Sequence, residues 1–224
     1  RGDTKLTLPI DQVLEKDSHK DDFIENSEFN LTVATTPFLR MSGGISYLLQ
    51  YPYGCIEQTS SRLMPLVALR GLIDKGHVPE ITAATTAKYI KAGVDRLFMM
   101  QTESGGFGYW PGNKNPHMMG TLYAMAALSI AKKNGVDVPE ERMQKSVSYL
   151  KNLINTNESL DKTFVAFGSY ILSLNDAFDS PNENFLRRVS GKSTEAEMFM
   201  LLARNNSGFP VKQKVEGYIR KIFF

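Results

Sequence analysis

One stretch of the chain decides how the rest is interpreted: Tyr51-Pro52-Tyr53-Gly54-Cys55-Ile56-Glu57-Gln58-Thr59. It contains the only cysteine of the 224 residues, and Gln58 follows three positions later. If the backbone turns helically from Cys55, the side chains at i and i+3 lie on one face and reach each other. The thiol can then displace ammonia from the carboxamide and leave an internal thioester. Pro52 and Gly54 suit the tight turn that such a ring requires.

Cysteine and glutamine at this spacing are weak evidence on their own, because a lone cysteine is usually a small buried hydrophobic residue. The longer string from Leu48 to Arg62 closely resembles the thioester signature of the alpha-2-macroglobulin and complement family, whose core is Pro-x-Gly-Cys-x-Glu-Gln. The Tyr-Pro-Tyr-Gly-Cys form, followed by Thr-Ser-Ser-Arg, is similar to the bacterial members. The resemblance implies that Cys55 and Gln58 form the cross-link, in a motif completed by Pro52, Gly54 and Glu57.

The composition is that of an ordinary globular protein, with 42% hydrophobic residues, 22% charged residues and a formal net charge of +2. The small net charge does not indicate a nucleic-acid-binding protein, which would carry an excess of basic residues. No apolar run is long enough to span a bilayer. We expect no cofactor and no metal site. We also expect both ends to be internal boundaries of a longer protein, since Phe223-Phe224 stops inside an apolar pattern.

Residues 1–36 differ in pattern from the rest of the chain. Lys5-Leu6-Thr7-Leu8 and the stretch 29–36 alternate between apolar and polar residues, and a charged linker separates them. We predict two strands of a β-domain here. The resemblance implies a CUB-type β-sandwich, into which the thioester domain of this family is inserted. The predicted domains are therefore 1–36, a β segment with its linker, and 37–224, a helical thioester-containing domain.

From residue 37 onward we find no convincing strand. Pro65 predicts a kink or a restart in the second helix, and Gly76 and Gly135 predict helix ends. Helices joined by short loops form bundles, solenoids or α/α toroids, and the pattern alone does not choose among them. The resemblance implies a mainly α fold of the α/α toroid type, the terpenoid-cyclase-like ring of paired helices, with fewer helices than a closed ring needs. The predicted helices cover 38–50, 55–74, 80–100, 118–134, 138–153, 159–176, 182–190, 193–204 and a last segment from 210.

The segment from Gln101 to His117 is rich in glycine and proline and holds the only tryptophan. Two interpretations stay open: an aromatic cluster that closes one end of the fold, or a lid over the thioester. Its Gly-Gly-Phe-Gly-Tyr-Trp-Pro run is similar to the bacterial members of the family, in which the equivalent loop lies near the thioester. A thioester persists only where apolar groups keep water out. The candidate shielding residues are Tyr51, Tyr53, Tyr109, Trp110, Met118, Met119 and Tyr123.

The preferred acceptor of the acyl group is expected to depend on histidine. In the complement relatives, a histidine from a later helical hairpin attacks the thioester first and favours transfer to hydroxyls. The corresponding residues 154–158 contain no histidine. His117 is a candidate substitute, although a lone loop histidine is more often a surface group. We assign no general-base role to Glu57, and we expect uncatalysed transfer that favours lysine amines. A helix that begins near Cys55 would also stabilise a thiolate leaving group through its first amides.

The resemblance implies the thioester domain of a bacterial alpha-2-macroglobulin-like broad-spectrum protease inhibitor. A protease cuts a bait region outside this chain, the thioester is exposed, and a surface lysine of the protease becomes attached through Gln58. This is a single-turnover covalent trap rather than an enzyme. The implied partners are target proteases and other domains of the same protein. The implied location is the periplasm, with an anchor at the inner membrane through a lipidated N-terminus outside this segment.

Three alternatives compete with this interpretation. A prenyltransferase or terpenoid cyclase on the same fold needs metal ligands or an Asp-rich motif, and here Asp21-Asp22 stands alone. A cysteine hydrolase or transglutaminase needs a histidine to activate Cys55, and only His19, His77 and His117 are available. The third alternative is a helical scaffold in which the thioester never forms.

Overall fold

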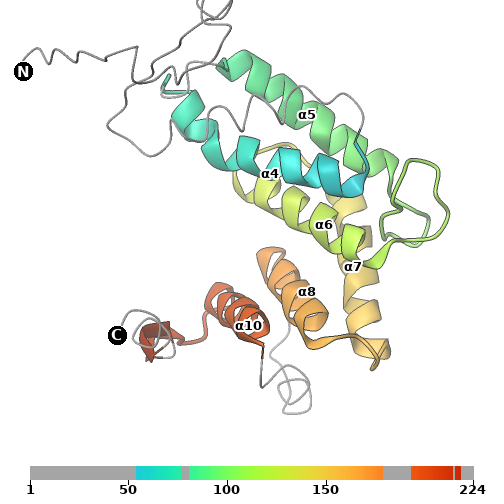
Figure 1. The fold of residues 1–224 in the computed structure, drawn as a ribbon, viewed down its shortest axis with the longest axis vertical. Coiled ribbons are helices and arrows are strands. Elements are labelled where there is room, and N and C mark those ends of the chain that lie inside the picture. The colour runs from blue at the N-terminus through green and yellow to red at the C-terminus, as the bar shows by residue number, and fades with distance from the viewer. Residues whose placement is uncertain (1–53, 77–80, 179–192, 214, 218–224) are drawn as a thin grey trace, which may run out of the picture. The chain divides into compact units, whose positions relative to one another are not determined.

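A computed structural model describes residues 54–76, 81–178, 193–213 and 215–217, all within the compact unit Phe38–Phe224. This part of the chain is helical and contains no β-strand, which confirms the mainly α prediction (Figure 1). The helices are α4 (Ile56–Ile73), α5 (Ala83–Met99), α6 (Met118–Lys133), α7 (Glu140–Thr156), α8 (Lys162–Leu174) and α10 (Thr194–Asn206). The predicted β segment 1–36 and the helices predicted over 38–50 and 182–190 lie outside the described residues. The predicted division at residues 36 and 37 stays a prediction.

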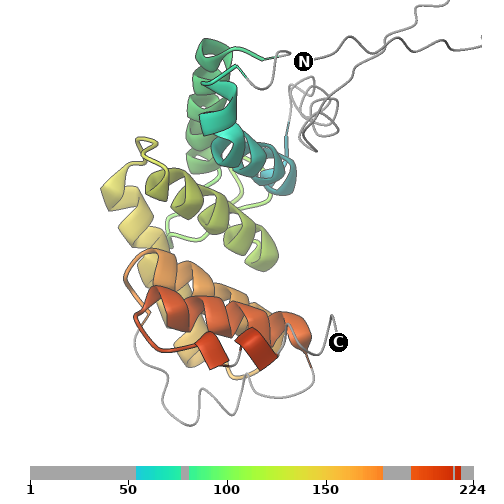
Figure 2. The same cartoon turned by 90° about the vertical axis from the view of Figure 1, so that its left-hand side faces the viewer.

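Four helices form a continuous layer in which α4 packs on α6, α6 on α8 and α8 on α10 (Figures 1 and 2). They run in the same direction. At their starts, Gly120 of α6 lies against Ile56 of α4. Near their ends, the Asn175 side chain donates a hydrogen bond to the Ser129 hydroxyl at 2.8 Å. Helices α5 and α7 connect successive members of this layer, which is the inner and outer alternation of paired hairpins in an α/α toroid.

The middle of the layer is α6, which is buried along most of its length because α4 and α8 cover its two sides. Its sequence from Ala124 to Leu128 is apolar and rich in alanine, so neighbouring helices can approach closely. Phe107, from the connection between α5 and α6, is fully buried in the same core. The start of α4 is therefore fixed from one side by α6.

Local chemistry explains where the helices begin and end. Thr82, Asp161 and Ser193 each accept a hydrogen bond from a backbone N–H of the first turn of the helix that follows them. The predicted stops at Gly76 and Gly135 are confirmed, since both glycines adopt positive φ, at 73° and 75°. Helix α4 continues without a break through Pro65, so the restart that this proline predicted is not found. None of the described helices has the length and apolarity to cross a membrane.

Candidate functional site

The candidate site is the first turn of α4. Cys55 is the N-cap residue of this helix and its side chain is buried, with 5% of the residue exposed. Gln58 is the third helical residue, and its side-chain oxygen accepts a hydrogen bond from the Cys55 backbone N–H at 3.1 Å. The Cys55 sulfur in turn faces the backbone N–H of Gln58, as in a capping box. The structure thus brings the thiol and the carboxamide together within one turn.

Gly54 closes the turn that leads into this helix. A Cβ atom at residue 54 would lie 2.8 Å from the Thr59 hydroxyl and 3.3 Å from the Thr59 backbone nitrogen, so a larger residue does not fit. The Gly54 carbonyl accepts hydrogen bonds at 3.4 Å from the Thr59 hydroxyl and from the Arg96 guanidinium. Glycine is therefore required at residue 54, because the first turn of α4 lies close to the residue that leads into the helix.

The aromatic loop between α5 and α6 contacts the start of α4. The backbone N–H of Ile56, which has no partner within its own helix, donates to the Tyr109 carbonyl at 3.1 Å. The loop is also tied to α6, because the Phe107 N–H donates to the Thr121 hydroxyl at 2.9 Å. The burial of Phe107 fits the interpretation as an aromatic cluster, and the lid over a thioester stays a prediction. Phe107 is buried in the core, while Tyr109 lies at the candidate site.

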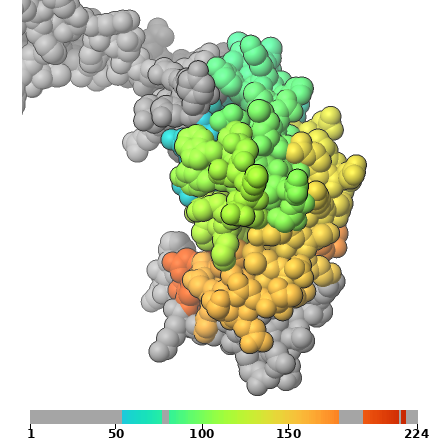
Figure 3. Space-filling model, turned by 90° about the vertical axis from the view of Figure 1, so that its right-hand side faces the viewer, coloured from blue at the N-terminus to red at the C-terminus, as the bar shows by residue number. Residues whose placement is uncertain are grey.

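Arg142 of α7 holds the beginning of this loop. Its guanidinium donates to the Gln101 side chain at 3.0 Å and to the Phe98 carbonyl, and it lies 4.6 Å from the centre of the Phe98 ring. Gly105 has a φ of 97°, and a Cβ there would lie 2.5 Å from the Lys145 carbonyl oxygen, so the loop backbone rests directly on α7. Figure 3 shows the surface of the loop beside the yellow surface of α7.

The Tyr109 side chain reaches Glu57 and Cys55. Its hydroxyl donates a long hydrogen bond of 3.4 Å to Glu57 Oε2. A hydrogen bond to the Cys55 side chain, together with the negative charges of Cys55 and Glu57, raises the pKa of Tyr109 to about 12. Its ring meets those of Trp110 and His117 edge to face, at centroid distances of 5.8 and 5.1 Å. Tyr109 thereby joins the motif helix to the aromatic loop.

The other predicted shielding residues are either exposed to solvent or outside the described part of the chain. Trp110 is 46% exposed, and Met118, Met119 and Tyr123 on α6 are exposed as well. Tyr51, Tyr53 and the motif residue Pro52 lie outside the described residues. Among the described residues, the shielding candidate Tyr109 contacts the first turn of α4, through Ile56 and Glu57. The shielding role of all seven residues stays a prediction.

His117 serves as the N-cap of α6. Its Nδ1 atom accepts a hydrogen bond from the Gly120 backbone N–H at 3.0 Å. In the neutral imidazole the proton then sits on Nε2, so neither ring nitrogen offers a free lone pair for attack on an acyl group. The turn between α7 and α8, where the family resemblance made a histidine relevant, has Asn157 and Ser159. They line a hollow together with Met118 and Met119.

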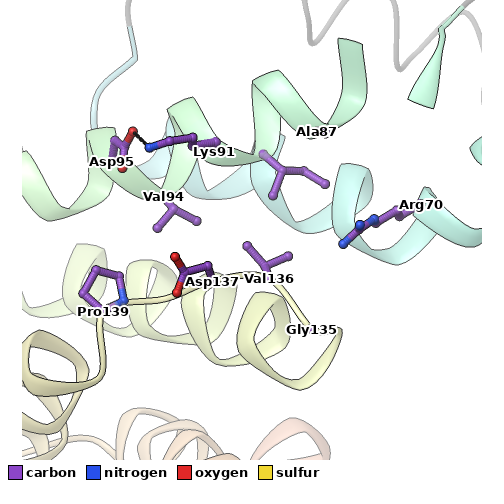
Figure 4. A pocket seen from close by; sticks show the side chains of 10 residues that line it. Arg70, Ala87, Lys91, Val94, Asp95, Gly135, Val136, Asp137 and Pro139 are labelled. Carbon is purple, nitrogen blue, oxygen red and sulfur yellow. Dashed lines mark hydrogen bonds and ion pairs between the residues drawn. The ribbon is translucent and has the colours of Figure 1, made fainter. Parts of the chain in front are cut away.

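A second hollow lies away from Cys55, between α4, α5 and the connection from α6 to α7 (Figure 4). Its rim carries Arg70, Lys91, Asp95 and Asp137, and the Lys91 ammonium pairs with the Asp95 carboxylate at 2.7 Å. None of the predicted site residues lines it. Over the described residues, no cluster of three histidine, cysteine or acidic side chains could hold a metal ion.

The parallel layer of helices, with cysteine and glutamine paired on the first turn of its first member, defines a class: helical toroid domains that carry a thioester signature. The family model of the A-macroglobulin TED domain matches residues 30–164, and the chain belongs to this family. The resemblance to bacterial alpha-2-macroglobulins and the α/α toroid fold are both confirmed.

The relatives are much longer than this chain. The alpha-2-macroglobulin of Thermotoga maritima is 32% identical over 154 residues, which cover 66% of this chain and 9% of that protein. The structure of Salmonella alpha-2-macroglobulin reacted with methylamine matches with a TM-score of 0.62 and 24% identity, over 75% of this chain and 12% of the other. Trypsin-activated alpha-2-macroglobulin from Escherichia coli matches with a TM-score of 0.53 and 20% identity, over 69% and 13%.

Proposed function

We propose that this chain is the thioester domain of a bacterial alpha-2-macroglobulin-like protease inhibitor, in which Cys55 and Gln58 form an internal thioester. The observation that carries the proposal is the hydrogen bond of 3.1 Å from the Cys55 N–H to Gln58 Oε1. It holds the side-chain carbonyl over the same turn as the buried sulfur. Attack of the sulfur on the Gln58 carbonyl carbon, with ammonia as the leaving group, then closes the ring within this turn.

The same hydrogen bond has a role when the ring opens. An attacking amine forms a bond to the Gln58 carbonyl carbon, and negative charge gathers on the oxygen that the Cys55 N–H already contacts. The carbon–sulfur bond then breaks, an amide remains on Gln58, and the sulfur leaves as a thiol. Nothing regenerates the thioester, so each molecule acylates one target.

The targets that we propose are proteases, through their surface lysines. The Escherichia coli relative has been activated by trypsin, and the Salmonella relative has reacted with methylamine, a primary amine. Since the Nδ1 atom of His117 is engaged in capping α6, we propose direct transfer that prefers amines over hydroxyls. We further propose that the site is covered by other domains of the full-length protein, and that this protein resides in the periplasm with a lipid anchor at the inner membrane.

The test is covalent capture of a protease. The full-length protein is incubated with trypsin and analysed under denaturing conditions, alongside Cys55→Ala and alongside trypsin whose lysines are dimethylated. We expect a conjugate only with the unmodified pair, linked through Gln58 in its peptide map. A conjugate that forms equally well with Cys55→Ala would contradict the proposal, because it would not depend on the thioester.

A further inference from the structure

We propose that Tyr109 donates its phenolic hydrogen bond to the Cys55 sulfur as the thioester opens, and that Glu57 holds the hydroxyl until then. The inference rests on the proposed function, because it assigns a residue to the opening of that thioester. It differs from the predicted shielding role of Tyr109, which depends on the ring and not on the hydroxyl.

The hydroxyl is positioned by three independent contacts. The Tyr109 backbone carbonyl is fixed by the Ile56 N–H at 3.1 Å, its ring packs edge to face on His117 at 5.1 Å, and its hydroxyl reaches Glu57 Oε2 at 3.4 Å. Cys55 is the N-cap of the helix whose second residue is Glu57, so its side chain lies on the same first turn of α4 that the Tyr109 hydroxyl contacts. One donor therefore faces two acceptors that change differently during the reaction.

The charge on the sulfur decides which acceptor the hydroxyl prefers. In the intact thioester the sulfur is uncharged and accepts hydrogen bonds weakly, so the hydroxyl stays with the Glu57 carboxylate. As the amine bonds to the carbonyl carbon, the electron pair of the breaking carbon–sulfur bond moves onto the sulfur. A hydrogen bond to this developing thiolate is stronger than one to the ground state, and only such a difference accelerates the step. The bond to Glu57, at 3.4 Å, is long and easily exchanged.

Tyr109 acts in this account as a hydrogen-bond donor and not as an acid. The pKa of its phenol is raised to about 12, so the phenol is a weak acid at neutral pH. Transfer of the phenolic proton to the sulfur would therefore be unfavourable, and the proton stays on Tyr109. The proton that the sulfur finally carries is the one that the attacking amine loses to solvent, so the sum of the reaction is thioester plus amine giving amide plus thiol.

The test compares Tyr109→Phe with wild type and with Tyr149→Phe in the full-length protein. Tyr149 is a half-buried tyrosine on α7 that packs under the same loop, so its variant controls for loss of a buried hydroxyl. The rate of thiol release is measured with methylamine and with water alone. We expect Tyr109→Phe to be slower by about tenfold with both, below the 10²–10³ of a donor to a developing oxyanion because sulfur accepts more weakly. Tyr149→Phe should match wild type.

The two roles of Tyr109 give opposite results. Phenylalanine keeps the ring, so a pure shield predicts an unchanged or faster release, and that outcome overturns the inference. If Tyr109→Phe does not fold, Glu57→Gln provides the second test. Loss of the carboxylate frees the hydroxyl for the sulfur, so release should be faster than in wild type, and slower release overturns the inference. A wild-type protein with a free thiol from the start overturns the proposed function itself, and this inference with it.

Discussion

Replacing Gly120 with alanine should destabilise the chain, although alanine normally favours a helix over glycine. A Cβ atom at residue 120 would lie 2.6 Å from the Ile56 Cγ2 atom and 2.9 Å from the His117 Nδ1 atom. Ile56 is fully buried, and its branched side chain has few alternative rotamers in a helix. The contact therefore cannot be relieved by a simple side-chain rotation, and α6 must move away from the start of α4.

The magnitude follows from two opposing effects. Overpacking of a well-filled core destabilises by about 1–3 kcal/mol, and the change from glycine to alanine in a helix returns about 1 kcal/mol. We expect a net loss of about 1 kcal/mol, which for a chain of this size lowers Tm by about 2–4 °C. Gly71 of α4 is the matched control, since it is an exposed helical glycine with no atom within 4 Å of its Cβ position. Gly71→Ala should stabilise by about 0.5–1 kcal/mol.

Thermal and urea unfolding followed by circular dichroism measure both variants. A double-mutant cycle with Ile56→Ala adds a direct test, because removal of Cγ2 should reduce the penalty of Gly120→Ala, while the contact with the His117 Nδ1 atom remains. If Gly120→Ala were as stabilising as Gly71→Ala, the reasoning that α6 fixes the start of α4 through this close contact would be refuted.

Three further predictions concern the site. Gly54→Ala should lower both Tm and the fraction of protein that carries a thioester, because the new Cβ would lie 2.8 Å from the Thr59 hydroxyl. Thr59→Ala, added to Gly54→Ala, should restore part of both values. If thermal unfolding and intact mass show no such rescue, this contact is not the cause. His117→Ala should lose about 1 kcal/mol of stability and His117→Asn much less, since asparagine also caps helices; equal losses in the two variants, measured by thermal unfolding, would count against the capping role of the imidazole. After the thioester has been opened, phenolate absorbance should show that Tyr109 ionises near pH 12 and not at about pH 10, the ordinary value for tyrosine. Because the folded-state pKa of Tyr109 is raised, its contribution to the free energy of unfolding is complete below about pH 10 and is lost as the pH rises towards 12. The absorbance change near pH 12 should be absent from Tyr109→Phe.

Much of the helical order follows from sequence pattern. The six labelled helices match predicted ranges because apolar periodicity, caps such as Asp161 and glycine stops such as Gly76 act locally. The restart predicted at Pro65 is wrong, because α4 continues through this residue. Pro65 lacks an N–H for the Ser61 carbonyl, but Ser61 is exposed to solvent, while buried Leu63 and Leu66 hold the helix against its neighbours. Tertiary packing thus outweighs a local rule.

The site was predictable only in part. The spacing of Cys55 and Gln58 indicated their shared turn, and the aromatic run indicated a loop with a specific role. The hydrogen bond from Tyr109 to Glu57 joins residues far apart in the sequence, and so does the hydrogen bond from Arg142 to Gln101. No local pattern encodes such pairs. The capping role of His117 had a local signal, its place directly before an apolar helical run, but asparagine, aspartate, serine and threonine are the usual caps.

The most direct test of the central claim is the intact mass of freshly purified full-length protein, measured with and without methylamine and beside Cys55→Ala. The account predicts a mass below that of the sequence by one ammonia, then one methylamine adduct with one free thiol, and neither change in the variant. An unmodified mass with a free Cys55 thiol from the start would contradict it, and the motif would then belong to a helical scaffold that forms no thioester.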